Sequence, residues 1–198
     1  AALQQLDNVL TITPNQLDAL KLQGFLYASA GELDKAIAAY QAYITLVPED
    51  LDATFVTARL MTDANQTEQA EPLVDALLAI NSNNELLNQL KGIARFNAKD
   101  NENALLYTEK AILNNPEDPG LRLLAGYSAY ILEDYRTAHQ HLSMIADKLP
   151  ANHEGLRILA VSQLRLGLSV EAGVTANSIE QLSSKDPSLI SFSASPIV

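Results

Sequence analysis

The sequence predicts an all-α fold, a right-handed superhelical solenoid of helix-turn-helix repeats. Two observations lead to this prediction: small residues return every 34 residues, and each interval holds two segments with helical periodicity. Counting in steps of 34 from Gly24 reaches four more small residues: Ala58, Gly92, Gly126 and Ala160. The same count from Ala36 reaches only alanine: Ala70, Ala104, Ala138 and Ala172. Because closely crossing helices need small side chains where their backbones approach, these columns predict the crossing points of paired helices.

The first complete repeat, residues 15–48, shows how each unit is built. Its first predicted helix places apolar or small residues along one face: Leu17, Leu20, Gly24 and Tyr27. After a break at Gly31, the second predicted helix does the same: Ala36, Ile37, Tyr40, Tyr43 and Ile44. Pro48 ends the repeat, because the residue before a proline is pushed away from helical dihedral angles.

The period assigns residues 1–186 to a single array. Residues 1–14 are predicted to be the second helix of a preceding repeat, and five full repeats follow: 15–48, 49–82, 83–116, 117–150 and 151–184. Residues 187–198 are predicted to be a partial repeat or a disordered tail, because Pro196 and the Ser and β-branched content disfavour a full helix. The chain opens at Ala1 without Met or a signal-like segment, so we expect it to be a piece of a longer protein.

These columns resemble the tetratricopeptide repeat (TPR) family. In the family numbering, Leu17 is repeat position 1. Gly24 then matches the small residue at position 8, Ala36 the alanine at position 20, and Pro48 the proline at position 32. Tyr27 and Tyr40 match the aromatic residues at positions 11 and 24. The resemblance implies a helical solenoid that binds other proteins without a cofactor, and it does not identify the partner, because this scaffold serves many systems.

Two residues depart from the family pattern. Pro72 falls within a predicted second helix, where we expect it to bend or shorten that helix. Arg95 stands where the family has an inward-leaning aromatic residue. We expect its aliphatic stem to pack and its guanidinium to reach solvent.

Composition and charge exclude several function classes. The chain has 198 residues, with 24 acidic against 13 basic side chains and a net charge of −11, which argues against binding to nucleic acid or anionic lipid. No apolar run approaches the roughly 18 residues of a membrane-spanning helix, so we predict no membrane insertion. The absence of Cys excludes disulfides, a thiolate nucleophile and a Cys zinc site.

No motif in the sequence indicates catalysis. His139 and His141 are two residues apart on a predicted helix and cannot chelate one ion, and His153 lies in a turn. No glycine-rich loop suited to binding phosphate occurs, because the glycines are spread over helix crossings and turns. We therefore predict a protein that is not an enzyme and holds no metal or cofactor.

The family resemblance implies a partner-binding site on the first helices of the repeats. In TPR arrays these helices line a concave groove, mainly through repeat positions 2, 5, 9, 12 and 13. Transferred to this sequence, the predicted partner-binding residues are Lys21, Phe25, Phe55, Arg59, Gln89, Ile93, Phe96, Asn97, Leu123, Tyr127, Tyr130, Arg157, Val161, Leu164 and Arg165. Aromatic residues and Arg are typical of binding hot spots. We expect an extended or helical peptide with apolar side chains, whose acidic or C-terminal groups contact the basic residues of this set.

Two alternatives concern individual residues of this set. Phe25 and Tyr127 are equally consistent with packing between adjacent first helices, whereas Phe55, Phe96 and Tyr130 are harder to explain as core. Lys21 matches a lysine of the chaperone-binding members of the family. Phe25 and Arg59, however, stand where those members have Asn, so we predict no binding of chaperone C-termini.

A second functional interpretation is self-assembly. Homo-oligomers could form through exposed ends of the array or through the apolar C-terminal segment. That segment contains Leu189, Ile190, Phe192, Ile197 and Val198. By analogy, we expect a bacterial secretion, export or envelope-biogenesis protein. The Asn/Gln-rich, acidic, Cys-free composition suits the periplasm or cell envelope and, nearly as well, the cytoplasm.

Overall fold

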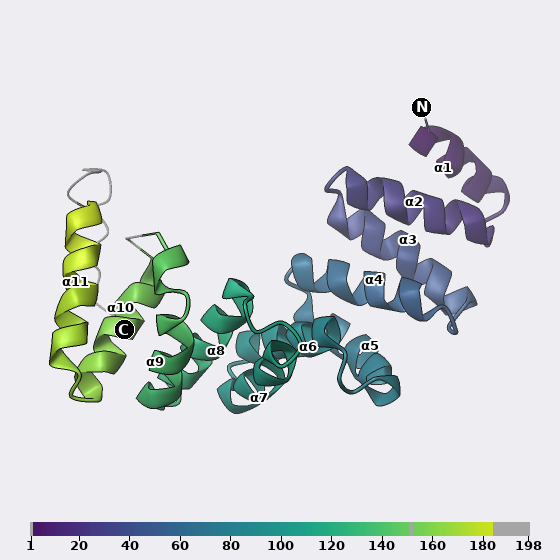
Figure 1. Cartoon of the computed structure of the whole chain (residues 1–198). Coiled ribbons are helices and arrows are strands. Elements are labelled where there is room, and N and C mark those ends of the chain that lie inside the picture. Colours follow the sequence, from purple (N-terminus) through teal and green to yellow (C-terminus); the bar gives the residue numbers. More distant parts are fainter. Residues whose placement is uncertain (1, 151–152, 184–198) are drawn as a thin grey trace. The chain divides into compact units, whose positions relative to one another are not determined.

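The computed structural model describes residues 2–150 and 153–183, and in this part of the chain it contains eleven α-helices, one short 3-10 helix and no strand (Figure 1). The all-α prediction is therefore confirmed. The helices are α1 (Ala2–Ile12), α2 (Leu17–Ser29), α3 (Leu33–Leu46), α4 (Leu51–Asp63), α5 (Thr67–Ile80), α6 (Glu85–Asn97), α7 (Asn101–Ile112), α8 (Pro119–Ile131), α9 (Tyr135–Ser143), η1 (Ala146–Lys148), α10 (Glu154–Arg165) and α11 (Ser169–Ser183). The predicted segment 187–198 lies outside the described residues. None of the helices described here combines the length and the apolar character that crossing a membrane requires.

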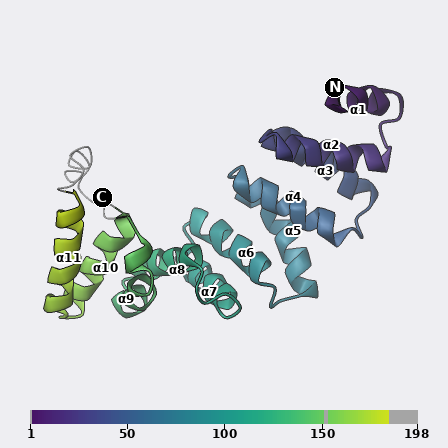
Figure 2. The same ribbon diagram turned by 45° about the horizontal axis from the view of Figure 1, so that its top comes forward.

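The helices form two compact units, Ala1–Ala98 (unit 1) and Lys99–Val198 (unit 2). In unit 1, α3 packs against α2 and α4, and α5 packs against α4 and α6, an arrangement visible in Figures 1 and 2. In unit 2, α8 packs against α7, α9 and α10, and α11 packs against α10. We call α2, α4, α6, α8 and α10 first helices, and α3, α5, α7, α9 and α11 second helices. The repeat boundaries stay a prediction, since the division between the units falls inside the interval 83–116.

Four of the first helices begin at acidic or amide caps that recur every 34 residues. At α2 the cap is Gln16, whose side chain accepts a hydrogen bond from the Ala19 N–H at 2.7 Å. The side chains of Asp50, Asn84 and Asp118 each accept a hydrogen bond from the backbone N–H three residues later, at 2.9 to 3.0 Å. Such caps satisfy N–H groups that the first turn of a helix leaves unpaired. These residues therefore set where α4, α6 and α8 begin.

Each of the five turns between a first helix and the following second helix contains one residue with a left-handed backbone. These residues are again 34 apart: Gly31, Asn65, Lys99, Glu133 and Gly167, with φ between 58° and 78°. At Glu133 the helix ends in a Schellman motif, with the Asp134 N–H donating to the Ala129 carbonyl at 2.9 Å. Glycine adopts this conformation freely, whereas a side chain raises its free energy. The turns predicted from the sequence thus have one shared backbone geometry.

The small-residue columns lie where paired helices cross. A Cβ atom at Gly24 would lie 2.7 Å from the Tyr40 ring, and one at Gly126 would lie 2.6 Å from Leu142 Cγ. In the repeat 49–82, Ala58 packs in one cluster with Val74, which is smaller than Tyr40 or Leu142. The two residues of each pair are 16 apart in the sequence. The glycines of the first helices face the large residues Tyr40 and Leu142, whereas Ala58 faces the smaller Val74.

The expected shortening at Pro72 is wrong. Helix α5 runs through Pro72 and has 14 residues, as many as α3. Pro72 is exposed and its missing N–H removes a single hydrogen bond, to the carbonyl of Glu68. Packing of α5 against α4 and α6 maintains the helix on both sides of this position.

Candidate functional site

The predicted partner-binding residues divide between the two units. Eight lie on α2, α4 and α6 of unit 1, and seven lie on α8 and α10 of unit 2. All fifteen are exposed or half-buried rather than fully buried. Each of them therefore lies on a first helix with a side chain that is not fully buried, and their joint role as a binding site stays a prediction.

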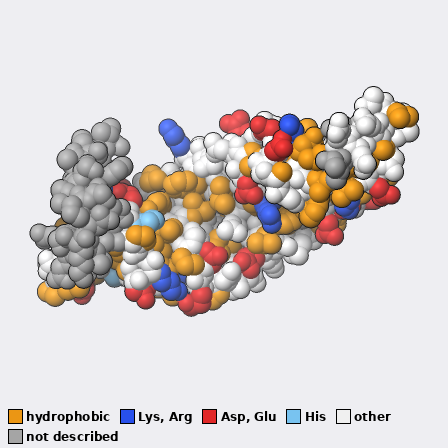
Figure 3. Space-filling view, turned by 90° about the horizontal axis from the view of Figure 1, so that it is seen from above, with side chains coloured by type: hydrophobic (Ala, Val, Ile, Leu, Met, Phe, Trp, Pro, Cys, Tyr) orange, Lys and Arg blue, Asp and Glu red, His pale blue; other side chains and the backbone are white. Residues whose placement is uncertain are grey.

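We give the name first-helix face to the large apolar residues of this set in unit 1: Phe25 on α2, Phe55 on α4, and Ile93 and Phe96 on α6. Phe25 is 58% exposed, so the alternative of a core role is wrong for this residue. Phe55 is half-buried and packs against the cluster of Ala58, Val74 and Leu90. In Figure 3, exposed hydrophobic side chains lie among acidic and a few basic ones over the N-terminal helices, on the right.

Lys21 contacts two residues of unit 1, Asp50 and Tyr43. Its Nζ lies 2.7 Å from Asp50 Oδ2 and 5.1 Å from the centre of the Tyr43 ring. Asp50 also accepts from the Ala53 N–H and from the Tyr43 hydroxyl, both at 2.9 Å. Lys21, the Ala53 N–H and Tyr43 together lower the pKa of Asp50 to about 2. Lys21 thus joins α2 to the start of α4.

All five basic side chains of unit 1 are in ion pairs with acidic residues of that unit. Besides Lys21, Lys35 pairs with Glu32 at 2.5 Å and Arg59 with Asp63 at 3.9 Å. Lys91 and Arg95 pair with residues of α5, as described next. Lys21 and Arg59 thus have acidic neighbours in their own unit, and their contact with acidic groups of a partner stays a prediction.

Four charged side chains join α5 to α6. Lys91 is 5% exposed, and its Nζ lies 2.6 Å from Glu71 Oε1 and 2.5 Å from Asp75 Oδ1. Arg95, whose side chain is 27% exposed, also pairs with Glu71, a partner that the sequence did not predict. Burial is tolerated because both cations face carboxylates, since a buried charge without a partner is costly. The sequence did not show this network because its members are 16 to 24 residues apart.

In unit 2 the predicted residues of α8 contribute to the core. Leu123, Tyr127 and Tyr130 are half-buried and pack against one buried cluster: Leu142, Ile145, Ile158 and Leu159. Burial raises the pKa of the Tyr127 hydroxyl. The Tyr130 ring lies 6.0 Å from that of Tyr135 in an edge-to-face contact. These residues are thus engaged in packing more than the sequence indicated.

The predicted residues of α10 are more exposed. Leu164 is 59% exposed, and Val161 is half-buried. Arg157 pairs with Glu154 at 3.3 Å, and the guanidinium of Arg165 lies 5.7 Å from the centre of the Tyr135 ring. Both arginines therefore already have a neighbour within unit 2.

Two of the three histidines, His141 and His153, contact other residues of unit 2. His153 accepts a hydrogen bond from the Gly155 N–H at 3.0 Å and caps α10. His141 is 7% exposed, with Nδ1 3.0 Å from Arg122 and Nε2 3.6 Å from Glu109. Burial, followed by the charge of Arg122, lowers the pKa of His141, and Glu109 opposes this shift. Among the described residues, no group of three His, Cys, Asp or Glu could hold a metal ion.

We expect the stability of unit 2 to decrease in mild acid because of His141. Its pKa is lower in the folded state than the ordinary 6.5, so its contribution is complete above pH 6.5 and is lost as pH falls toward the lowered pKa. Urea unfolding followed by circular dichroism should show stability decreasing as pH falls from about 7.5 to about 5.5. His141→Gln, which does not titrate, should remove that part of the decrease. An equal decrease in the variant would contradict this assignment.

A pocket opens where α4, α5 and α6 meet. This α4–α6 pocket has a volume of about 250 Å³. Its lining residues are Leu51, Asp52, Phe55, Leu77, Ile80, Asn81, Asn84, Leu86 and Leu87. Leu51, Ile80 and Leu86 are 44%, 66% and 48% exposed, and Phe55 connects the pocket to the first-helix face. Leu51 and Ile80 were not predicted as site residues. Each is an exposed apolar residue at a helix end, Leu51 directly after the cap Asp50 and Ile80 directly before Asn81.

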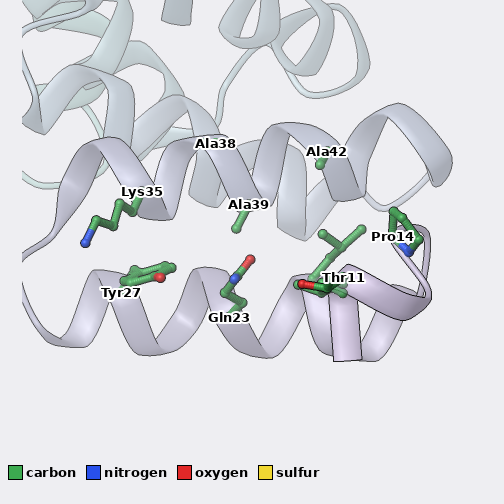
Figure 4. A pocket seen from close by; sticks show the side chains of 10 residues that line it. Thr11, Pro14, Gln23, Tyr27, Lys35, Ala38, Ala39 and Ala42 are labelled. Atoms are coloured by element: carbon green, nitrogen blue, oxygen red, sulfur yellow. The ribbon is translucent and has the colours of Figure 1, made fainter. Parts of the chain in front are cut away.

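A larger pocket lies against α1, α2 and α3 (Figure 4). It has a volume of about 530 Å³, and three alanines of α3 line it: Ala38, Ala39 and Ala42. Figure 4 shows Gln23 and Tyr27 of α2 on the opposite side, with Thr11 and Pro14 at one end. The lining of this pocket thus combines small apolar side chains with polar ones, and α2 and α3 contribute most of it.

These helix pairs define an all-α repeat protein. Two tetratricopeptide repeat models match the sequence, at residues 1–50 and 27–93. Residues 1–93 therefore belong to the tetratricopeptide repeat family, as the resemblance predicted, and the chain has the fold of a helical TPR solenoid. Among curated proteins no sequence matches this chain significantly.

Solved structures support the fold. MamA of AMB-1 is similar with a TM-score of 0.75 and 16% identity, over 85% of this chain and 92% of that one. YrrB, described as a TPR protein with an unusual peptide-binding site, is similar with a TM-score of 0.73 and 15% identity, over 96% and 97%. MamA from Desulfovibrio magneticus RS-1 has a TM-score of 0.65 and 20% identity, over 73% and 82%. At these identities the similarity establishes the fold alone.

Proposed function

We propose that this chain is a non-catalytic protein-interaction scaffold that binds a peptide segment of another protein on the first-helix face. The proposal depends on one observation: Phe25, Phe55 and Phe96 lie on three successive first helices without being fully buried. Rigid aromatic side chains on a preformed surface are typical of binding hot spots. YrrB, which has the same fold, is described as binding peptide, and this supports the same role here.

The proposed ligand contacts are apolar, because the cations of unit 1 are already paired. The biological setting that we propose is a larger bacterial protein of secretion, export or envelope biogenesis. This setting rests on analogy, and the acidic, Cys-free composition is compatible with it.

The test is peptide capture by a variant with Phe25, Phe55 and Phe96 all changed to Ala. We expect short random peptides displayed on phage to be enriched on the wild-type chain. The selected peptides should bind the triple variant at least about tenfold more weakly, because its aromatic anchors are gone. Circular dichroism should show unchanged helix content. A matched control changes exposed leucines elsewhere, Leu22, Leu46 and Leu106, to Ala. Equal binding by the Phe variant and the control would refute the first-helix face.

A second candidate function is self-assembly, and exposed apolar surface favours it. The pocket against α1, α2 and α3 leaves Tyr27 half-buried and Ala38 and Ala42 of α3 exposed, and Val170 and Val174 of α11 are 79% and 63% exposed. Such surfaces bind neighbouring repeats in arrays of this kind. Light scattering over a dilution series distinguishes the two functions, because a monomer at every concentration would exclude self-assembly.

A further inference from the structure

We infer that the α4–α6 pocket binds one apolar side chain of a partner peptide whose neighbouring residues are Lys or Arg. This inference rests on the proposed function and specifies the chemistry of the ligand. Three observations lead to it: the size and lining of the pocket, the charges around it, and the capped helix ends beside it.

The size and lining of the pocket select a side chain rather than a free small molecule. Its volume of about 250 Å³ lies below the roughly 300–1,000 Å³ of small-molecule sites. Apolar side chains from three helices form most of its lining, and exposed Leu86 and Ile80 are beside the opening. An apolar group of a peptide would displace water from these surfaces. Phe55 belongs to both the pocket and the first-helix face, so a peptide on that face can reach the pocket.

The charges around the pocket select the residues next to that side chain. Asp52 is the only charged residue among the nine lining residues, all of which are described, and it is exposed. Asp18 occupies the corresponding position of the preceding first helix and is also exposed. Unit 1 has twelve acidic and five basic residues, a formal charge of −7. All five basic residues are in ion pairs within the unit. A basic peptide therefore meets complementary charge, which steers association and selects the partner.

The helix ends beside the pocket do not offer a site for an anion. The N-terminus of a helix attracts anions through unpaired N–H groups. At α4 and α6, however, the side chains of Asp50 and Asn84 already accept from the Ala53 and Leu87 N–H groups. Asp52, in the first turn of α4, adds a negative charge there. An acidic peptide or a C-terminal carboxylate would thus face a carboxylate with no free cation to compensate it.

The experiment uses the peptides that phage display selects on the full chain. We expect the selected sequences to combine Leu, Ile, Met or Phe with a neighbouring Lys or Arg. Fluorescence anisotropy of a synthetic selected peptide should show at least about tenfold weaker binding to Leu86→Glu, which places a charge in the pocket. Asp52→Lys should weaken binding about fivefold or more, because it reverses the one charge in the pocket.

Two matched controls separate pocket effects from general effects of charge. Glu68 is the second residue of α5, as Asp52 is of α4, and Glu68→Lys makes the same change in charge outside the pocket. Leu22 is 48% exposed, as is Leu86, and Leu22→Glu places the same group on α2. Both controls should keep binding within about twofold of the wild type, and circular dichroism should confirm the helix content of all four variants.

The other outcomes overturn the inference in distinguishable ways. Selected peptides rich in Asp or Glu, or binding retained by Asp52→Lys, would reject the basic ligand and leave the proposed function standing. Binding lost in the triple Phe variant but retained in Leu86→Glu would reject the pocket alone. No enrichment of any peptide would reject the proposed function, and this inference with it.

Discussion

Replacing Lys91 by Met should destabilise unit 1 by about 2–3 kcal/mol. Breaking a buried ion pair by removing one partner costs about 3–5 kcal/mol, because the other charge stays desolvated. Here the cost is lower because Asp75 is 55% exposed and Glu71 keeps Arg95 as a partner. Amide hydrogen exchange of the full chain should locate the effect, with protection falling about 30-fold to 100-fold in α5 and α6.

Lys35→Met is the matched control for this prediction. Lys35 pairs with Glu32 at 2.5 Å, but their side chains are 61% and 42% exposed, so its loss should cost less than about 1 kcal/mol. Equal small effects at Lys91 and Lys35 would show that the network contributes little.

Changing Gly126 to Ala should destabilise unit 2, whereas the same change at Gly173 should stabilise it. Alanine favours a helix over glycine by up to about 1 kcal/mol, and a Cβ at Gly173 would meet no atom within 4 Å. At Gly126 the Cβ would meet fully buried Leu142, and such overpacking costs about 1–3 kcal/mol. We expect urea unfolding to show opposite shifts of the midpoint.

A second change tests the cause of the effect at Gly126. Adding Leu142→Val should recover part of the loss, because Ala58 and Val74 already pack at the equivalent positions of another repeat. If Gly126→Ala stabilises as much as Gly173→Ala, the crossing is less tight than its distances indicate.

The fold was predictable because its constraints repeat along the chain. Gly24 and Ala36 begin columns that every repeat continues, and the period reveals them without any knowledge of contacts. The turns were predictable as breaks, but their shared geometry was not, since Lys99 and Glu133 are not residues that a left-handed backbone favours. Pro72 misled the prediction, because local propensity is weaker than packing on both sides of a helix.

For the candidate site, the sequence predicted only which helix carries each residue. The family pattern placed Phe25 and Phe55 on first helices, and the structure has them there. The α4–α6 pocket also needs Ile80 of a second helix, and no period relates that residue to Phe55. Likewise the pairing of Lys21 with Asp50, 29 residues away, depends on how the helices pack. Register can be read from one sequence, whereas contacts between helices require the structure.

The complete pairing of cations in unit 1 has a consequence for how copies of the protein meet. With its lysines and arginines already neutralised, the unit presents a surplus of negative charge to any molecule that approaches. Two copies therefore repel each other at long range, and dissolved ions screen that repulsion beyond a Debye length of about 8 Å at physiological ionic strength. Dilute buffer thus disfavours encounters between copies, whereas concentrated salt permits them.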